Sequence, residues 1–405
     1  MGEESLAPLG ILLLAACLIA MLTRRFGWPY AVGLAAAGIG IAYLPIAPTI
    51  HLSRNLIFNI FLPPLVFEAA LQLGWNSFRR ELPVTLLLAF AGVAISAAVV
   101  TAGMHWIVGW SWIGAALFGV LIAATDPVSV IASFRELKVE PRLSMLVESE
   151  SLLNDGVVAV GFVVLAGIVD GASSSPLAAA GAFLWTMGGG ALIGVVAGGS
   201  TLLIAGKTDD HLVEITLTTV AAYGSFLFAE HFHASGVFAS MAAGLVIGSL
   251  GWKGAISDAG RDHLMSAWDY FAFLANSFVF ILIGMQLATT PVLRIGLATI
   301  AIAVLLVLVS RAASVYPLAA LFRRSHLAVP GRYQHILVWG GLRGALGLAL
   351  ALALPAVPER SAIVLTTFIV VAFSLFVQGL TMPLLVRRLG IMCGAGDTDE
   401  RCRPV

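Results

Sequence analysis

Between Glu150 and Asp155 the chain carries a run of polar residues inside a segment that is otherwise apolar. On an α-helix Ser151 and Asp155 are four residues apart and lie on one face, as do Glu150 and Asn154. The two pairs form neighbouring stripes about 100° apart, so one helix face presents two carboxylates, a hydroxyl and a carboxamide. These oxygen atoms suit a hard monovalent cation, and the run has none of the imidazole or thiolate ligands that transition metals prefer.

A second polar group, Thr125–Asp126, lies directly before Pro127. Because proline has no N–H, the carbonyl of Ala123 loses its helical hydrogen bond, and the residue before a proline avoids helical angles. We expect the helix to break there and to present free carbonyls, a hydroxyl and a carboxylate in the middle of an apolar segment. A plain proline kink is the alternative, but a kink does not require a carboxylate.

A third feature is the sequence WGGLRGALG at residues 339–347, in which glycines surround Arg343. Glycine weakens a helix and allows close approach of another backbone. A small-residue packing face, Gly340-xxx-Gly344, is the alternative explanation for the glycines, although it does not account for the arginine. Two segments interrupted by Gly or Pro at corresponding places of two halves are typical of a transporter binding site.

Charged residues deep in apolar surroundings cost about 2.5–3.5 kcal/mol each on the insertion scale. The six that we find are Glu68, Asp126, Glu150, Asp155, Arg311 and Arg343. Four acids against two bases leave negative charge in excess, which indicates that a proton, a cation or both enter the site. We expect Glu68 to pair with Arg343 or Arg311, and Arg311 to neutralise an acid or a broken helix end.

The elements that must hold these residues are membrane-spanning helices. Of the 405 residues, 60% are hydrophobic and 11% are charged, whereas a typical soluble domain is about 45–50% apolar and 25% charged. A water-soluble protein of this size is therefore excluded. At roughly 20 residues per span, the sequence predicts an all-α polytopic membrane protein of about thirteen transmembrane helices. The apolar segments lie near 6–22, 28–44, 54–73, 83–108, 111–134, 143–169, 177–205, 212–230, 235–250, 268–288, 292–320, 333–355 and 361–386.

The positive charges test this topology. Most of the 22 Lys and Arg residues fall in alternate loops and in the tail, which predicts an N-terminus outside and a C-terminus in the cytoplasm. The odd number of spans indicates two inverted six-helix repeats around one connecting helix near 177–205, with the fifth and twelfth spans as broken crossing helices.

Several classes of function are disfavoured. The formal net charge is zero, so the basic excess that a nucleic-acid partner requires is missing. The sequence contains no HExxH, no serine beside a placed histidine and no cofactor fingerprint, so we expect neither an enzyme nor a cofactor. A cation-selective channel is the remaining alternative, because acids and broken helices can line a pore. A channel, however, needs no site that a proton and a cation occupy in turn.

Six motifs together resemble the sodium/proton exchangers, specifically the electroneutral branch of the cation:proton antiporters. They are FLPPLVFEAAL (61–71), ATDPV (124–128), ESLLNDG (150–156), HASGVFASMAAGLVIG (233–248), FILIGMQL (280–287) and GLRGALGLALAL (341–352). The motifs follow the order of the family, and the resemblance covers roughly residues 10–390.

This resemblance implies a homodimer in the lipid of the cell (inner) membrane, in which a core carries the ion by an elevator-like movement. The whole chain, 1–405, would be one transmembrane ion-exchanger domain with a short cytoplasmic tail at 389–405. Its dimerisation part would come from spans near 6–73 and 177–250. Its ion-carrying core would come from spans near 83–169 and 268–386.

The resemblance also implies roles for the buried residues. Asp155 would exchange a proton for a monovalent cation, most directly Na⁺, with Li⁺ and K⁺ as alternatives. The cation would be coordinated by Asp155, Glu150, Ser151, Asp126 and Thr125. A supporting network would consist of Asn154, Glu68, Arg343 and Arg311. In this branch of the family the successive Asn154 and Asp155 mark one-for-one exchange.

Overall fold

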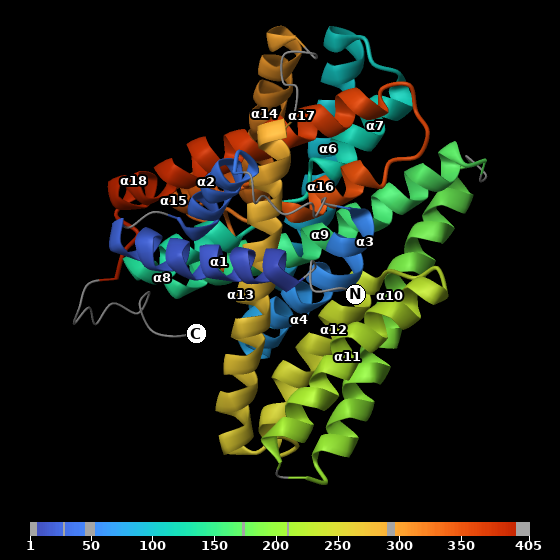
Figure 1. Cartoon of the computed structure of the whole chain (residues 1–405). Coiled ribbons are helices and arrows are strands. Elements are labelled where there is room, and N and C mark those ends of the chain that lie inside the picture. The colour runs from blue at the N-terminus through green and yellow to red at the C-terminus, as the bar shows by residue number, and fades with distance from the viewer. Residues whose placement is uncertain are drawn as a thin grey trace. The chain divides into compact units, whose positions relative to one another are not determined.

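The computed structural model describes residues 6–26, 29–44, 53–171, 175–208, 210–289 and 296–393 (Figure 1). Within these ranges the chain forms helices joined by short connections, and its β structure is a single isolated antiparallel bridge between Val139 and Met392. The all-α prediction is therefore confirmed. The first five residues and most of the expected tail lie outside the described residues.

Short connections join successive helices along the chain. They are α1 (Leu6–Phe26), α2 (Tyr30–Ala42), α3 (Arg54–Leu56), α4 (Leu62–Gln72), α5 (Trp75–Leu87), α6 (Val93–Gly103), α7 (Trp112–Leu121), α8 (Val128–Leu137), α9 (Pro141–Val169), α10 (Pro176–Ala205), α11 (His211–His231), α12 (Gly236–Leu250), α13 (Asp258–Thr289), α14 (Leu297–Leu321), α15 (Gly331–Trp339), α16 (Ala345–Leu352), α17 (Arg360–Phe373) and α18 (Leu380–Leu389). Wider π-helical turns link α3 to α4, α5 to α6 and α17 to α18, so that each pair forms one continuous helical segment.

Among the residues that the structure describes, seven helices are long and apolar enough to cross a membrane. They cover residues 75–108, 141–169, 177–205, 211–231, 260–288, 297–321 and 360–389. Shorter apolar helices include Tyr30–Ala42 and Gly236–Leu250. The chain is thus a multi-pass helical membrane protein, as predicted, while the count of thirteen spans stays a prediction.

Side-chain caps set several helix starts. Ser175 accepts a hydrogen bond from the N–H of Ala178 at 3.2 Å and is followed by Pro176 in the first turn of α10. Asp210 caps α11 in the same way through the N–H of Leu212. Such residues satisfy N–H groups that have no partner within the helix, so these boundaries follow from local sequence.

Two helical segments are interrupted where the sequence indicates a break. Helix α7 ends at Leu121 and α8 begins at Val128, with residues 122–127 outside helical structure. Helix α15 ends at Trp339 and α16 begins at Ala345. The first gap contains the residues around Pro127 and the second contains the glycines around Arg343. That these segments are the crossing helices of two inverted repeats stays a prediction.

The chain packs into two compact units. The first comprises Met1–Arg54, Pro83–Asn154 and Ser277–Val405, and the second comprises Asn55–Leu82 and Asp155–Asn276. These units are defined by packing alone. The expected dimerisation and ion-carrying parts are a separate, functional division and stay a prediction.

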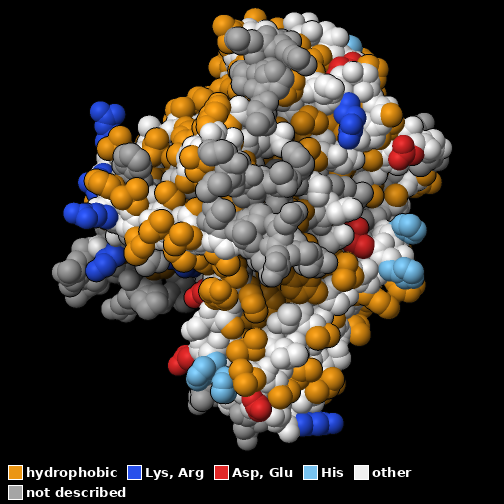
Figure 2. Space-filling view, viewed as in Figure 1, with side chains coloured by type: hydrophobic (Ala, Val, Ile, Leu, Met, Phe, Trp, Pro, Cys, Tyr) orange, Lys and Arg blue, Asp and Glu red, His pale blue; other side chains and the backbone are white. Residues whose placement is uncertain are grey.

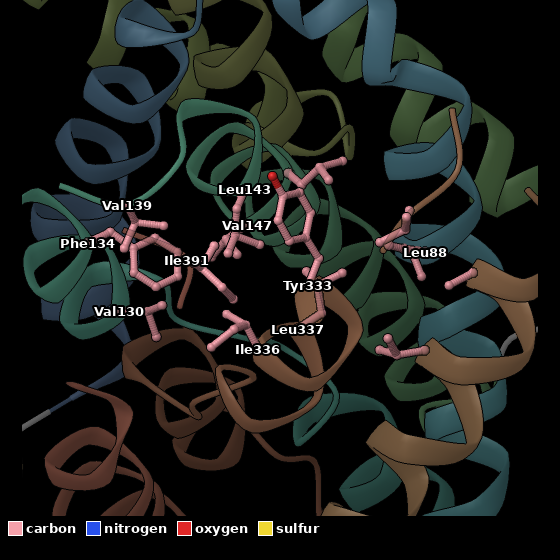
Figure 3. Close-up of a cluster of buried hydrophobic side chains, with 14 of the residues drawn as sticks. Leu88, Val130, Phe134, Val139, Leu143, Val147, Tyr333, Ile336, Leu337 and Ile391 are labelled. Carbon is pink, nitrogen blue, oxygen red and sulfur yellow. The ribbon is translucent and has the colours of Figure 1, made fainter. Parts of the chain in front are cut away.

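The core of the first unit holds α8, α9 and α15 together (Figure 3). Phe134 of α8, Leu143 and Val147 of α9 and Ile336 of α15 are all buried and face one another in this cluster. Since Val147 lies less than one turn before Glu150, the cluster fixes the part of α9 that carries the polar run. In the second unit the rings of Phe67 and Trp268 lie 4.3 Å apart within a separate core.

Within the first unit, α2 and the end of α13 approach so closely that both need glycine. A Cβ atom on Gly38 would overlap the carbonyl oxygen of Ile281, and one on Gly284 would overlap the carbonyl oxygen of Ala35. The overlapped atoms belong to the backbone and cannot turn aside. These two glycines therefore set the distance between the two helices.

We expect Gly38→Ala to lower the stability of the purified protein by about 1–3 kcal/mol, because overpacking forces the helices apart. Thermal unfolding in detergent, followed by the fraction that remains monodisperse, measures the change. Gly40→Ala on the same helix is the matched control, since a Cβ there meets nothing within 4 Å. Equal melting temperatures for the two variants would contradict the close packing.

Candidate ion-binding site

The two interrupted segments meet in the first unit. The N–H of Asp126 donates a hydrogen bond to the carbonyl oxygen of Leu342 at 2.8 Å. Gly344 lies against the side chain of Asp126, and a Cβ at this position would overlap that carboxylate. Glycine is therefore required at 344 for the two segments to meet. The glycines thus serve close packing, which was the alternative explanation for them, and this packing lies within the candidate site.

Arg343 satisfies the carbonyl groups that the first interruption sets free. Its Nη1 donates to the carbonyl oxygens of Ala123, at 2.7 Å, and Ala124, at 3.1 Å. The Ala123 carbonyl is the one that Pro127 deprives of a partner, and it also accepts a hydrogen bond from Asn154 Nδ2 at 3.2 Å. A cation at the carbonyl end of a helix is favourable, so this buried arginine stabilises the break.

Arg311 forms a buried bidentate ion pair with Glu150. Its Nη1 and Nη2 donate to the two carboxylate oxygens at 2.8 Å each, and its Nε donates to the carbonyl oxygen of Leu337 at 3.1 Å. The two side chains are 7% and 2% exposed. Arg311 thus neutralises an acid, as expected, but that acid is Glu150. Glu68, in the second unit, accepts a hydrogen bond from Gln72.

The expected pairing of Glu68, in the second unit, with Arg343 or Arg311, in the first, stays a prediction. Arg343 is directed to backbone carbonyls and Arg311 to Glu150. Gly341 makes room for the second of these arginines, because a Cβ there would lie 2.7 Å from Arg311 Nε. Whether Glu68 takes part in a supporting network stays a prediction.

Polar side chains of α9 bind the other end of the first interruption. The hydroxyl of Ser151 donates to the carbonyl oxygen of Thr125, and Asn154 Nδ2 donates to Thr125 Oγ1 at 3.3 Å. Asp126 Oδ1 accepts the N–H of Val128 at 3.0 Å. Asn154 Oδ1 is buried and has no hydrogen-bond partner among the described residues, so it is an oxygen atom with lone pairs to offer.

Asp155 occupies the next position of α9 and is half-buried. Because α9 is continuous from Pro141 to Val169, Ser151 and Asp155 lie one turn apart on one face, as the sequence predicts. The helix therefore presents a carboxylate next to the residues that hold the interruption.

A small cavity of about 10 Å³ adjoins the ion pair. It is lined by Thr125, Pro127, Val147, Glu150, Ser151, Arg311, Leu337 and Gly340. A volume of about 10–15 Å³ is the least that holds one water molecule. The polar cavity thus has room for about one water molecule or one small ion beside Thr125 and Ser151.

Two further residues position the site and were not found from the sequence. Ser374 Oγ accepts the N–H of Arg343 at 3.0 Å and donates to its carbonyl oxygen at 3.1 Å. Gln378 Nε2 donates to the carbonyl oxygen of Trp339 at 3.0 Å. The two residues are four positions apart in an otherwise apolar segment, so they share a helix face. That spacing was the available signal.

Comparison with known proteins shows the family to which the chain belongs. Residues 11–388 match the family described as "Sodium/hydrogen exchanger, transmembrane". The chain belongs to this family of membrane transporters, and the resemblance drawn from its motifs is confirmed. It is a cation:proton antiporter of the NhaP type rather than an enzyme.

Individual relatives share much of the chain. The Na⁺/H⁺ antiporter ApNhaP of Aphanothece halophytica is 38% identical over 376 residues, which cover 92% of this chain and 71% of that protein. The Na⁺/H⁺ antiporter NhaP of Pseudomonas aeruginosa is 35% identical over 345 residues, or 83% of this chain and 81% of that protein. The structure of the sodium proton antiporter MjNhaP1 from Methanocaldococcus jannaschii superposes with a TM-score of 0.76. It covers 96% of this chain and 99% of its own at 19% identity, which shows a common fold.

We expect Glu150→Ala and Arg311→Ala each to destabilise the protein by about 3–5 kcal/mol, because either change leaves a buried charge without its partner. The double variant should lose less than the sum, with a coupling energy of roughly 1–3 kcal/mol. Denaturant unfolding in detergent measures all four proteins of the cycle.

The control cycle uses Glu140 and Arg332, whose nearest charged atoms lie 3.2 Å apart with Arg332 29% exposed. Solvent should reduce that coupling to less than about 1 kcal/mol. Additive losses at Glu150 and Arg311 would show that their contact stabilises nothing.

Proposed function

We propose that the protein exchanges a monovalent cation, most directly Na⁺, for H⁺ across the membrane in one-for-one, electroneutral exchange. The observation that carries this proposal is the charge balance around the interruption. The polar segments carry three acids, Asp126, Glu150 and Asp155, and two bases, Arg311 and Arg343, and the ion pair with Arg311 cancels Glu150. One negative charge is left, and one proton or one monovalent cation neutralises it. The relatives ApNhaP and NhaP are Na⁺/H⁺ antiporters, which supports the same activity.

In this proposal Asp155 binds either the proton or the cation. Both together would leave a positive charge in a medium of low dielectric constant, where an uncompensated ion is costly. Oxygen atoms of Asp126, Thr125 and Ser151 would complete the coordination. Among the proposed ligands Glu150 is the least available, because both of its oxygens already accept hydrogen bonds from Arg311.

Alternating access would follow from the free-energy cost of an uncompensated charge in the apolar interior. A site that holds a proton or a cation is neutral and can move between the two sides, while the empty site carries a charge and stays in place. We propose that the core spans near 83–169 and 268–386 make this movement against dimerisation spans near 6–73 and 177–250. The protein would be a homodimer in the cell (inner) membrane, with the N-terminus outside and the C-terminus in the cytoplasm.

We expect Asp155→Asn to abolish exchange, because an amide cannot alternate between binding a proton and a cation. In proteoliposomes that contain a pH-sensitive dye, a sodium jump should drive proton movement with the unchanged protein and reduce it to the rate of empty liposomes with the variant. Repeating the jump with Li⁺ and K⁺ gives the ion preference.

Asp170→Asn is the matched control, since this exposed aspartate follows the end of the same helix and should keep the normal rate. A valinomycin-clamped potassium potential should leave the sodium-driven rate unchanged if exchange is electroneutral and K⁺ is not carried. Full exchange by the Asp155 variant would refute its role, and ohmic current in planar bilayers would favour a channel instead.

A further inference from the structure

A groove lies between α14, α15 and α18 of the first unit, apart from the proposed ion site. Its volume is about 980 Å³. Tyr316 comes from α14, His335 and Trp339 from α15, and Leu384, Arg387 and Arg388 from α18. The groove is large enough for an extended ligand, and no residue of the proposed exchange mechanism lines it.

The residues that line the groove change from apolar to basic along α18. Thr381, Leu384 and Arg388 follow at spacings of three and four, so they lie on one face of the helix. The wall is apolar and aromatic beside Leu384, which is 64% exposed, and beside Trp339, whose Nε1 donates to Thr381 Oγ1 at 2.9 Å. One turn further on, the same face becomes basic. A molecule that fits this groove has an apolar part and an anionic end.

The basic end is open to a ligand. The side chains of Arg387 and Arg388 are exposed, and neither forms an ion pair or a side-chain hydrogen bond with another residue that the structure describes. None of the residues that line the groove is acidic. Figure 2 shows Lys and Arg side chains beside hydrophobic ones on the left of the surface, where Figure 1 places α18.

We propose that this groove binds an anionic phospholipid, with its phosphate at Arg387 and Arg388 and an acyl chain along Leu384 and Trp339. Basic pockets between transmembrane helices bind anionic head groups, and tryptophan favours the boundary between head groups and acyl chains. The ends of α14 and α18 both carry paired arginines, at 323–324 and 387–388, which puts the basic end at one membrane surface. A soluble anion would leave the apolar wall uncovered.

The bound lipid would contact α15 at Trp339, directly before the second interruption. Binding of the lipid would therefore stabilise α15, the helix that leads to Arg343. The binding itself does not depend on the proposed exchange, so it can be tested without transport.

Native mass spectrometry of the delipidated full chain tests the proposal with two lipids of identical acyl chains, phosphatidylglycerol and phosphatidylcholine. We expect the unchanged protein to retain the anionic lipid preferentially. Arg387→Gln with Arg388→Gln should lower its retention roughly fivefold for each arginine. Leu384→Trp, which fills the apolar wall, should lower retention of both lipids.

The matched control is Arg323→Gln with Arg324→Gln, which removes the same charge from the same side outside the groove and should keep the preference. Glycerol phosphate, the head group without chains, should not compete. The proposal fails if both arginine pairs lower retention equally, if the 387–388 variant keeps the preference, or if glycerol phosphate displaces the lipid. It also fails if Leu384→Trp changes the oligomeric state and leaves lipid retention intact, because the groove would then bind a second copy of the chain.

Discussion

The contact between Arg343 and the carbonyl oxygens of Ala123 and Ala124 is the interaction on which the site depends. Pro127 removes a hydrogen bond from the helix, and a buried carbonyl without a donor costs several kcal/mol in an apolar medium. The guanidinium supplies the donors and brings a positive charge to the carbonyl end. Without Gly344 the second backbone could not come this close. The two interrupted helical segments are thus held together at this contact.

This use of Arg343 determines the charge that remains. An arginine that binds backbone carbonyls still counts as one positive charge, but it forms no ion pair with Asp126 among the described residues. Arg311 is fully engaged by Glu150. Within the first unit, Asp126 therefore has no positively charged partner among the described residues, and a mobile cation or proton can take that place. The proposed exchange follows from this imbalance.

Local chemistry made part of the structure predictable. Pro127 and the glycines around Arg343 act within their own segments, so both interruptions could be located from the sequence. The stripe of Ser151 and Asp155 required only helical periodicity. Long-range partners could not be found in this way, because Glu150 and Arg311 are separated by 161 positions. The spacing of Ser374 and Gln378 indicates a polar helix face, but it does not identify the backbone of Arg343 as the partner of Ser374.

In the proposed exchange, a cation and a proton exclude each other at Asp155. Isothermal titration calorimetry of Na⁺ into the purified protein, repeated in buffers of different ionisation enthalpy, counts the protons released on binding. The account predicts about one proton released for each Na⁺ bound at a pH where the free site is protonated, and neither binding nor release with Asp155→Asn. Sodium binding to the protonated site without release of a proton would contradict it.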